Sequence, residues 1–383
     1  MSSRPAQPHM SRPVYLAGTG SYLPGPPIPY DSIAAVLGDI VGAPERIRRW
    51  SEQASRMMRE LVDIDVVHYA FDPKTREVTD DNVSMSVKAA HKALAMAGLE
   101  PTAIDLLCYG SAHQDQMPTA SVRIQEALGI ERCDELGIHA NCTSAYKALY
   151  LAHQLIAHGR NEQALVLSSS MSSSELRAEY YNPALVDKES LFLRWFLCDG
   201  AGALVLSSDP RRSIGLELEA TYIESVGGKR PSLMFNERPA YWLNPREEYE
   251  RGLHHLRQRF RNALSSGLFR EPDGGSVFFN GLKRMVEREH IPIDRIRVFQ
   301  VNMPTKHIID SIMDECVSFG IPREALFTRL DRLGYCGPPM VLIGLDEVVR
   351  QVELRPGDRV VSFVTEVSKF MQAGYSMKQI GTH

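Results

Sequence analysis

The sequence predicts a layered α/β fold that is built from two similar halves. In the first half a strand, a helix, a second strand and a cysteine-led helix follow one another, and Ile104 and Cys142 are 38 positions apart. The same order recurs from Ile293 to Cys336, which are 43 positions apart. One unit that recurs at similar spacing is typical of an internal duplication. We therefore expect one ancestral unit to occur twice in the chain.

Apolar periodicity identifies the elements of each half. In the first half we expect the strands LLCYGSA (106–112), ELGIHAN (135–141) and QALVLSSS (163–170), with a helix at TASVRIQEALGI (119–130). In the second we expect strands at RIRVFQVN (295–302) and DRVVSFVTE (358–366), with helices in 303–321 and after Cys336. Short β-branched runs that alternate with helices indicate parallel or mixed sheets, covered by helices on both faces.

Three parts follow from this division of the 383-residue chain. We expect a disordered leader at 1–13, an N-terminal half at 14–207 and a C-terminal half at 208–383. The second half carries an insert near 223–292, where the amphipathic run REEYERGLHHLRQRFRNALSSGLF (246–269) predicts an added helix. Such an insert either covers an active site or elaborates the surface.

Composition limits the classes of function. The net charge of −4 gives no general attraction to nucleic acid or to an anionic membrane. No run approaches about 18 apolar residues, and the N-terminal segment lacks the apolar core of a signal peptide, so we expect a cytoplasmic protein. The six cysteines are scattered, which predicts neither disulfides nor a metal site. The serine-rich run 168–174 is small and polar and predicts a loop at the edge of the site.

Cys142 follows an apolar strand and precedes a helix that ends at Gly159. The unpaired N–H groups and the positive end of the dipole at a helix N-terminus favour a thiolate. The pattern therefore predicts a nucleophile at the carboxyl edge of the sheet, where ligands of open α/β sheets bind. A small buried residue is the alternative, since free cysteines are usually buried. For Cys336, in the equivalent place, we expect the structural role.

Four segments together resemble the β-ketoacyl-ACP synthase III branch of the thiolase superfamily. They are MPTASVRIQEALGI (117–130), HANCTSAYKALYLAHQLI (139–156), ALVLSSS (164–170) and CDGAGALVLSS (198–208). The resemblance implies a thiolase-like five-layered αβαβα fold and a homodimer, or a heteromeric complex with other thiolase-like subunits. It also implies that Cys142 accepts an acyl group from CoA or an acyl carrier protein. Phosphopantetheine or CoA then enters as part of the substrate, and no separate cofactor is expected.

Two catalytic partners of the family are replaced here. Asn302 occupies the place of the family's histidine, and Tyr335 occupies the place of its asparagine. In condensing relatives these groups stabilise the charge that decarboxylation releases, and such a donor is typically worth about 3 to 4 kcal/mol. Asn302 and Tyr335 can still donate hydrogen bonds to a thioester carbonyl. These two departures from the family pattern therefore favour acyl transfer over decarboxylative condensation.

Other residues are candidates for substrate binding or proton transfer. In the loop HQDQMPT (113–119), Met117 matches the apolar residue that the family contributes to its partner's pocket. His113 and His307 are candidate substitutes for the missing histidine, although each also fits a packed or surface role. Glu366 stands where condensing relatives carry a glycine-rich turn. A carboxylate there either acts as a base or ends a strand, and a nearby charge raises the thiol pKa.

The sequence thus predicts an acyltransferase of specialised, polyketide or antibiotic-type metabolism that loads Cys142 and transfers its acyl group without decarboxylation. Two alternatives stay open. One is a decarboxylative condensing enzyme with a rebuilt site, and the other is a non-catalytic thiolase-like subunit of a heteromeric acyltransferase complex.

Overall fold

A computed structural model describes residues 11–113, 117–235, 245–252, 259–260, 269–272, 274–301, 303 and 305–381. Asn302 and the first ten residues of the expected leader lie outside this part of the chain. The side chain of His307 lies outside it as well.

A ten-stranded mixed sheet crosses the molecule in the order β12-β11-β13-β14-β8-β1-β7-β6-β4-β5. Its strands are β1 (Tyr15–Tyr22), β4 (Leu106–Ser111), β5 (Asp134–His139), β6 (Gln163–Met171), β7 (Asp199–Ser207), β8 (Leu216–Ser225), β11 (Ile296–Val301), β12 (Leu326–Phe327), β13 (Arg359–Glu366) and β14 (Met371–Gln379). The register of β1 against β8 spans two residue pairs, whereas β1 pairs with β7 along its whole length. The sheet therefore divides into two five-stranded halves, one from each predicted repeat.

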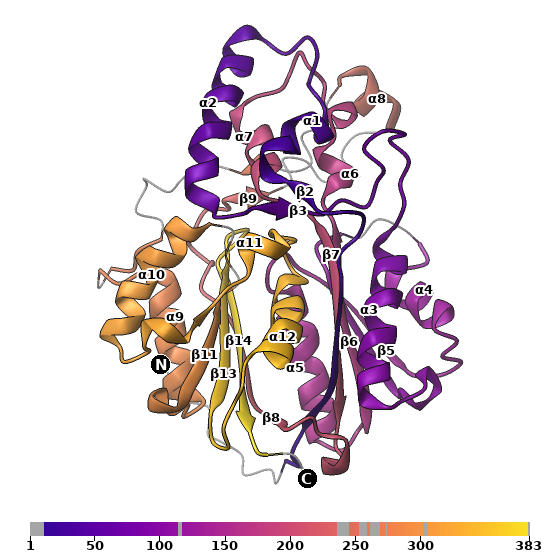
Figure 1. Ribbon diagram of the computed structural model, residues 1–383, viewed down its shortest axis with the longest axis vertical. Coiled ribbons are helices and arrows are strands. Elements are labelled where there is room, and N and C mark those ends of the chain that lie inside the picture. The colour runs from indigo at the N-terminus through magenta and orange to yellow at the C-terminus, as the bar shows by residue number, and fades with distance from the viewer. Residues whose placement is uncertain are drawn as a thin grey trace.

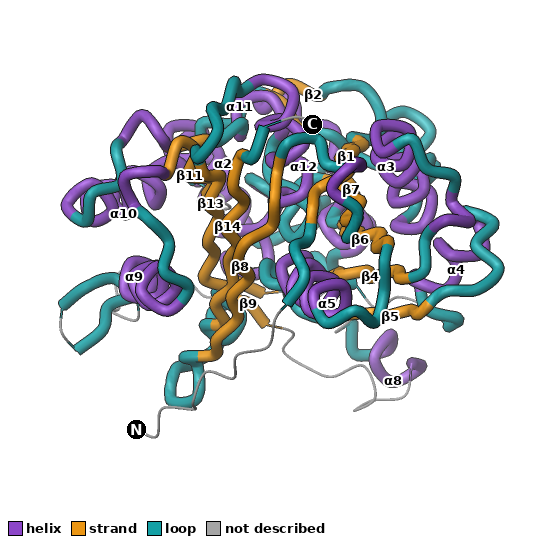
Figure 2. The backbone as a smooth tube through the Cα atoms, turned by 90° about the horizontal axis from the view of Figure 1, so that it is seen from below, coloured by secondary structure: helices purple, strands orange, loops and turns teal. Residues whose placement is uncertain are grey.

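Helices make the other layers (Figures 1 and 2). Between the half-sheets lie α5 (Ser144–Ala157) and α12 (Met340–Gln351), each of which contacts strands of both halves. The outer face of the first half-sheet is covered by α3 (Asn82–Ala97) and α4 (Ala120–Ala127). On the far side of the second half-sheet lie α9 (Val277–Arg288) and α10 (Lys306–Ser318). The predicted five-layered αβαβα fold is confirmed.

Shorter elements form a cap beyond one end of the strands (Figure 1). The cap contains α1 (Ile33–Leu37), α2 (Glu45–Val62), α6 (Ser173–Leu176), α7 (Lys188–Leu191), α8 (Pro245–Glu250) and two antiparallel two-stranded sheets, one of β2 (Ile28–Pro29) with β3 (Val66–Val67) and one of β9 (Met234–Phe235) with β10 (Arg259–Phe260). Beneath it, the one-turn helix α11 (Leu330–Leu333) leads toward α12. The cap therefore covers the end of the sheet at which the strands β5 and β13 reach their last residues.

Local sequence explains why the layers pack so closely. The helix α3 begins with a capping box between Asp81 and Ser84, which satisfies backbone donors of its first turn. It lies so near β1 that a Cβ atom at Gly20 would be 2.3 Å from the carbonyl oxygen of Ala89. Glycine is therefore required in β1 for this contact.

Two expectations are wrong. Ser168 to Ser170 are buried in β6, in agreement with the predicted strand 163–170, and do not form the loop expected for 168–174; the Oγ of Ser169 lies 2.8 Å from the Oη of Tyr109. The run 246–269 is not one helix. Within it α8 ends at Glu250, Gly252 has a φ of +61°, and β10 follows. Because glycine readily adopts a positive φ, Gly252 allows the chain to leave the helical path.

Candidate active site at Cys142

Cys142 lies in the turn between β5 and α5, two positions before the first helical residue. Its side chain is half-buried. The turn is held close to the neighbouring strand β4, where a Cβ atom at Gly110 would lie 2.3 Å from the carbonyl oxygen of Ser144. The absence of a side chain at Gly110 thus lets the start of α5 approach the sheet edge, which positions the thiol.

Tyr335 brings the second half of the chain to this thiol. Its phenol oxygen lies 3.6 Å from the Sγ of Cys142, within reach of a hydrogen bond to sulfur. The carbonyl oxygen of Tyr335 accepts a hydrogen bond from the backbone N–H of Cys198 at 3.0 Å, and its ring packs against Phe196 with centroids 6.2 Å apart. The phenol is buried, so its position is fixed by packing and by the backbone bond.

Glu366, the last residue of β13, binds the start of the same helix. Its Oε2 accepts hydrogen bonds from the backbone N–H of Thr143 at 2.9 Å and from the Thr143 hydroxyl at 2.5 Å. Its Oε1 accepts a hydrogen bond from Ser368. The carboxylate is almost fully buried, and it satisfies a backbone donor that a helix N-terminus leaves open.

The resting thiol is protonated. Burial raises the pKa of Cys142 to about 12, the negative charge of Glu366 adds to this rise, and the hydrogen bond with Tyr335 acts in the opposite direction. The expectation that a helix N-terminus would supply a resting thiolate is therefore wrong here. A carboxylate at that N-terminus offsets the field of the helix, and desolvation disfavours the anion. The expectation that Glu366 raises the thiol pKa is confirmed.

A cavity of about 300 Å³ lies beside the cysteine turn. Glu366 and Ser368 line one side of it, and His139 and Asn141 line another. Across the cavity, β9 contributes Met234, whose Sδ accepts a hydrogen bond from the Nδ2 of Asn141 at 3.2 Å. Two groups capable of proton transfer, a carboxylate and an imidazole, thus face one space next to Cys142.

The other predicted site residues are placed less centrally. His113 is the last described residue before 114–116, and its backbone N–H donates to the Oγ of Ser111 at 3.1 Å. Met117 is 87 % exposed. His307 lies in the first turn of α10. The structure therefore brings together Cys142, Tyr335 and Glu366.

Sequence reasoning missed Thr143 and the role of Asp199. Thr143 is the residue through which Glu366 reaches the helix, and a hydroxyl residue just before a predicted helix is a capping signal that identifies such a position. Asp199 is buried and accepts hydrogen bonds from the backbone N–H groups of Ala70 at 2.7 Å and Ser173 at 2.8 Å. The DGAGA motif thus joins β7 to the cap.

Neither a metal cluster nor a membrane span occurs in the part of the chain that the structure describes. No three His, Cys, Asp or Glu side chains there gather as metal ligands. No helix among the same residues combines the length and the hydropathy that a bilayer crossing requires.

Comparison with known proteins gives the same fold. Residues 136–221 match the family model of 3-oxoacyl-[acyl-carrier-protein] synthase III. The chain is 26% identical to the β-ketoacyl-ACP synthase III of Clostridium perfringens over 318 residues, which cover 83% of this chain and 89% of the relative. It is 24% identical to the enzyme of that name from Methylococcus capsulatus over 92% of this chain and 95% of the relative.

Several solved structures superpose on this chain over almost its whole length. The tetronic acid condensing enzyme AbyA1 superposes with a TM-score of 0.73 at 21% identity, covering 95% of this chain and 99% of that one. FabH of Pseudomonas aeruginosa gives 0.72 at 19% identity, covering 97% and 99%. The cerulenin-bound OleA of Xanthomonas gives 0.71 at 16% identity, covering 98% and 100%. The chain is thus similar in sequence to β-ketoacyl-ACP synthase III, and its fold is the thiolase fold of these solved structures.

Proposed function

We propose that the protein is an acyltransferase. It takes an acyl group from a CoA or carrier-protein thioester onto Cys142 and passes it, without decarboxylation, to an acceptor in polyketide or antibiotic-type metabolism. The observation that carries this proposal is the grouping of the Cys142 thiol with the phenol of Tyr335 and the carboxylate of Glu366. The relatives, which are synthases and a condensing enzyme by name, support acyl chemistry at this fold.

The loading step exchanges one thioester for another. The Sγ of Cys142 forms a bond to the acyl carbonyl carbon, the bond from that carbon to the donor sulfur breaks, and the thiol proton passes to the leaving sulfur. The phenol of Tyr335, which lies 3.6 Å from Sγ, is placed to donate a hydrogen bond to the oxyanion of the tetrahedral intermediate. No oxidant or reductant is needed.

The transfer step releases the thiol again. An acceptor O–H or N–H attacks the acyl carbonyl, the carbon–Sγ bond breaks, and the acceptor proton returns the sulfur to its thiol form. Glu366 and His139 line the cavity of about 300 Å³ beside the turn, where an acceptor of small size fits. Either group is positioned to accept the acceptor proton and relay it to the sulfur.

The charge of Glu366 disfavours decarboxylation at the same place. Loss of carbon dioxide from a malonyl group creates an enolate beside the cysteine, and the relatives stabilise this anion with paired hydrogen-bond donors. Here a buried carboxylate lies close enough to raise the pKa of Cys142. The field that disfavours a thiolate also disfavours an enolate, since both place negative charge next to Glu366.

We further propose that the protein works as a homodimer. The strand β5 forms one edge of the sheet, and its side chains are half-buried or exposed in the single chain. An open edge strand presents unpaired backbone groups that a second copy can pair with. The exposed side chain of Met117 is then available to the partner. Elution at twice the chain mass in size-exclusion chromatography with light scattering supports this arrangement, and elution as a monomer contradicts it.

Intact-protein mass spectrometry tests the acyltransferase proposal. The wild-type protein is incubated with a panel of acyl-CoAs and acyl carrier proteins beside the variants Cys142→Ala and Cys133→Ala. Cys133 is a matched control, because it is also a free and partly exposed thiol. We expect a mass increase in the wild type and in Cys133→Ala and none in Cys142→Ala. No adduct from any donor on folded protein would instead favour a non-catalytic subunit.

A further inference from the structure

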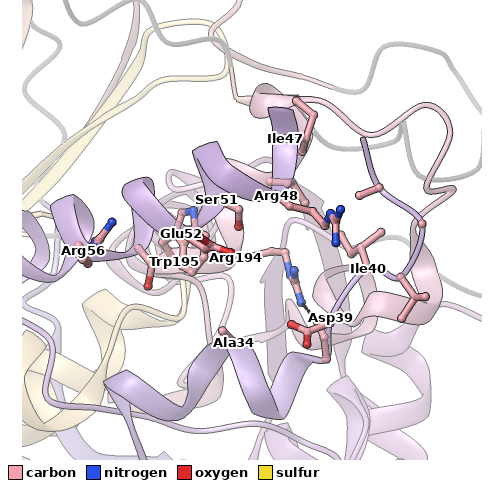
Figure 3. Close-up of a pocket in the computed structure, with 16 residues that line it drawn as sticks. Ala34, Asp39, Ile40, Ile47, Arg48, Ser51, Glu52, Arg56, Arg194 and Trp195 are labelled. Atoms are coloured by element: carbon pink, nitrogen blue, oxygen red, sulfur yellow. Dashed lines mark hydrogen bonds between the residues drawn. The ribbon is translucent and has the colours of Figure 1, made fainter. Parts of the chain in front are cut away.

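The cap contains a second cavity that is separate from the one beside Cys142. It has a volume of about 720 Å³ and lies between α1, α2 and the short 3-10 helix Phe192–Trp195 (Figure 3). It shares no lining residue with the cavity at the cysteine turn. Its volume is within the range of roughly 300 to 1,000 Å³ that is usual for small-molecule sites.

Arg194 carries a buried positive charge at this cavity. It is 7% exposed, its Nε donates to the carbonyl oxygen of Leu176 at 2.9 Å, and its Nη2 donates to the carbonyl oxygen of Gly38 at 2.6 Å. Within the described chain no carboxylate forms an ion pair with it. Asp39 and Glu179 act on its charge without forming an ion pair with it, and the ring of Tyr181 lies 5.6 Å from it, so the guanidinium has no direct anionic partner among the described residues.

Trp195, the next residue, supplies a buried donor. The indole ring lines the cavity and is 4% exposed. Its Nε1–H has no hydrogen-bond acceptor among the residues that the structure describes. A buried tryptophan N–H usually has an acceptor, and leaving one unpaired costs free energy. A ligand atom that accepts a hydrogen bond would satisfy it.

The remaining wall defines the charge and polarity of a ligand. Three arginines, Arg48, Arg56 and Arg194, and two acidic residues, Asp39 and Glu52, line the cavity (Figure 3). The excess is one positive charge, which suits a monoanion better than a dianion. Ser51 and Ser55 add two hydroxyl groups, and the rest of the wall is mainly apolar and includes Ile40, Ile47 and Leu191.

We propose that this cavity binds a small molecule with one carboxylate and an apolar body, at a site that is separate from Cys142. Arginine binds a carboxylate through two parallel N–H donors, and Arg194 and Arg48 both line the cavity. The carboxylate also accepts the hydrogen bond of the Trp195 indole. The inference does not depend on the acyltransferase proposal, because it involves none of the residues around the thiol.

Isothermal titration calorimetry of the full chain with benzoate tests the site, with benzamide as the neutral probe of the same shape. Two pairs of variants give matched controls. Arg48→Gln removes a charge from the cavity, whereas Arg49→Gln removes one from the opposite side of α2, where Arg49 and Trp50 line a different pocket. Trp195→Phe removes the indole donor, and Trp50→Phe removes a tryptophan that does not line the cavity.

We expect benzoate to bind the wild type and benzamide to bind at least about tenfold more weakly, since the hydrogen bonds to charge are lost. Arg48→Gln and Trp195→Phe each weaken benzoate binding about tenfold, whereas Arg49→Gln, Trp50→Phe and Cys142→Ala leave it unchanged. Saturating coenzyme A does not displace benzoate. The proposal is overturned if benzoate does not bind, if benzamide binds as tightly as benzoate, or if inorganic phosphate binds more tightly. It is also overturned if coenzyme A displaces benzoate, or if Arg48→Gln and Trp195→Phe both bind benzoate as tightly as the wild type.

Discussion

The phenol oxygen of Tyr335 lies 3.6 Å from the Sγ of Cys142, and this contact joins the two halves of the chain at the thiol that we propose to be acylated. By the resemblance, Tyr335 is expected at the position of a family asparagine, where it would supply one hydrogen-bond donor in place of another. We expect Tyr335→Phe to slow acylation of Cys142 by about tenfold or more, because the variant keeps the ring and loses the donor. Rapid-quench mass spectrometry measures the rate.

Tyr30→Phe is the matched control for that variant. Tyr30 is also a buried tyrosine, and its hydroxyl has no hydrogen-bond partner among the described residues. Its acylation rate should equal that of the wild type. An unchanged rate in Tyr335→Phe would show that the phenol takes no part in the reaction.

Glu366→Gln should lower the pKa of the Cys142 thiol from about 12, because a nearby negative charge is removed while the hydrogen bond from Thr143 can be kept. Each unit of decrease gives roughly ten times more thiolate at a fixed pH below the pKa. Alkylation by iodoacetamide, followed by peptide mass mapping between pH 7 and 10, should therefore be faster in the variant. Alkylation of Cys133 in the same digest is the internal reference. A slower reaction at Cys142 would contradict the electrostatic account.

The buried carboxyl group of Asp199 should make the free energy of unfolding depend on pH. Burial raises its pKa to about 6 in the folded protein from an ordinary value of 3.8. Between these values the folded state holds a proton that the unfolded state has released, so stability falls as pH rises through this window and levels off above it. The expected loss is about 3 kcal/mol. Urea unfolding from pH 4 to 7 should show this slope in the wild type and in the exposed-site variant Asp310→Asn. Asp199→Asn should lack it, and an identical slope there would assign the effect to other groups.

Gly110 allows the close approach of β4 to the start of α5. A Cβ atom there would lie 2.3 Å from the carbonyl oxygen of Ser144, which is backbone and has little freedom to move. Gly110→Ala should therefore lower the free energy of unfolding by about 2 kcal/mol and slow the acylation of Cys142. Gly228→Ala is the control, since no atom lies within 4 Å of a Cβ atom there. Equal stability of the two variants in chemical denaturation would contradict this packing.

The repeat of strand, helix, strand and cysteine-led helix could be predicted from the sequence. The elements of both halves are buried in the same way, and burial produces their apolar periodicity. The strand 163–170 was predicted as well, but the burial of Ser168–Ser170 was not, since it depends on neighbours such as Tyr109, which binds the hydroxyl of Ser169 and lies far away in the sequence. The helix predicted in 246–269 failed because periodicity does not reveal where Gly252 breaks it.

The candidate site, too, could be predicted from the sequence only in part. Cys142 was predicted from its place between a strand and a helix, and the resemblance pointed to Tyr335. The protonated state of the thiol was not predicted, because it depends on how deeply the turn is buried and on a carboxylate 224 positions away. Neither Arg194 nor Trp195 carried a sequence signal, since the cavity that they line is made by three separate segments.

The most direct test of the central claim is the fate of a labelled carboxyl group. Protein that has been acylated on Cys142 is mixed with malonyl-CoA carrying ¹³C in its free carboxyl group and, separately, with oxygen and nitrogen acceptors, and released ¹³CO₂ and acylated products are measured over single turnovers. We predict that the acyl group moves to an acceptor and that ¹³CO₂ does not exceed the level of Cys142→Ala. Release of ¹³CO₂ in step with loss of the acyl-enzyme would contradict transfer without decarboxylation and would establish a condensing enzyme with a rebuilt site.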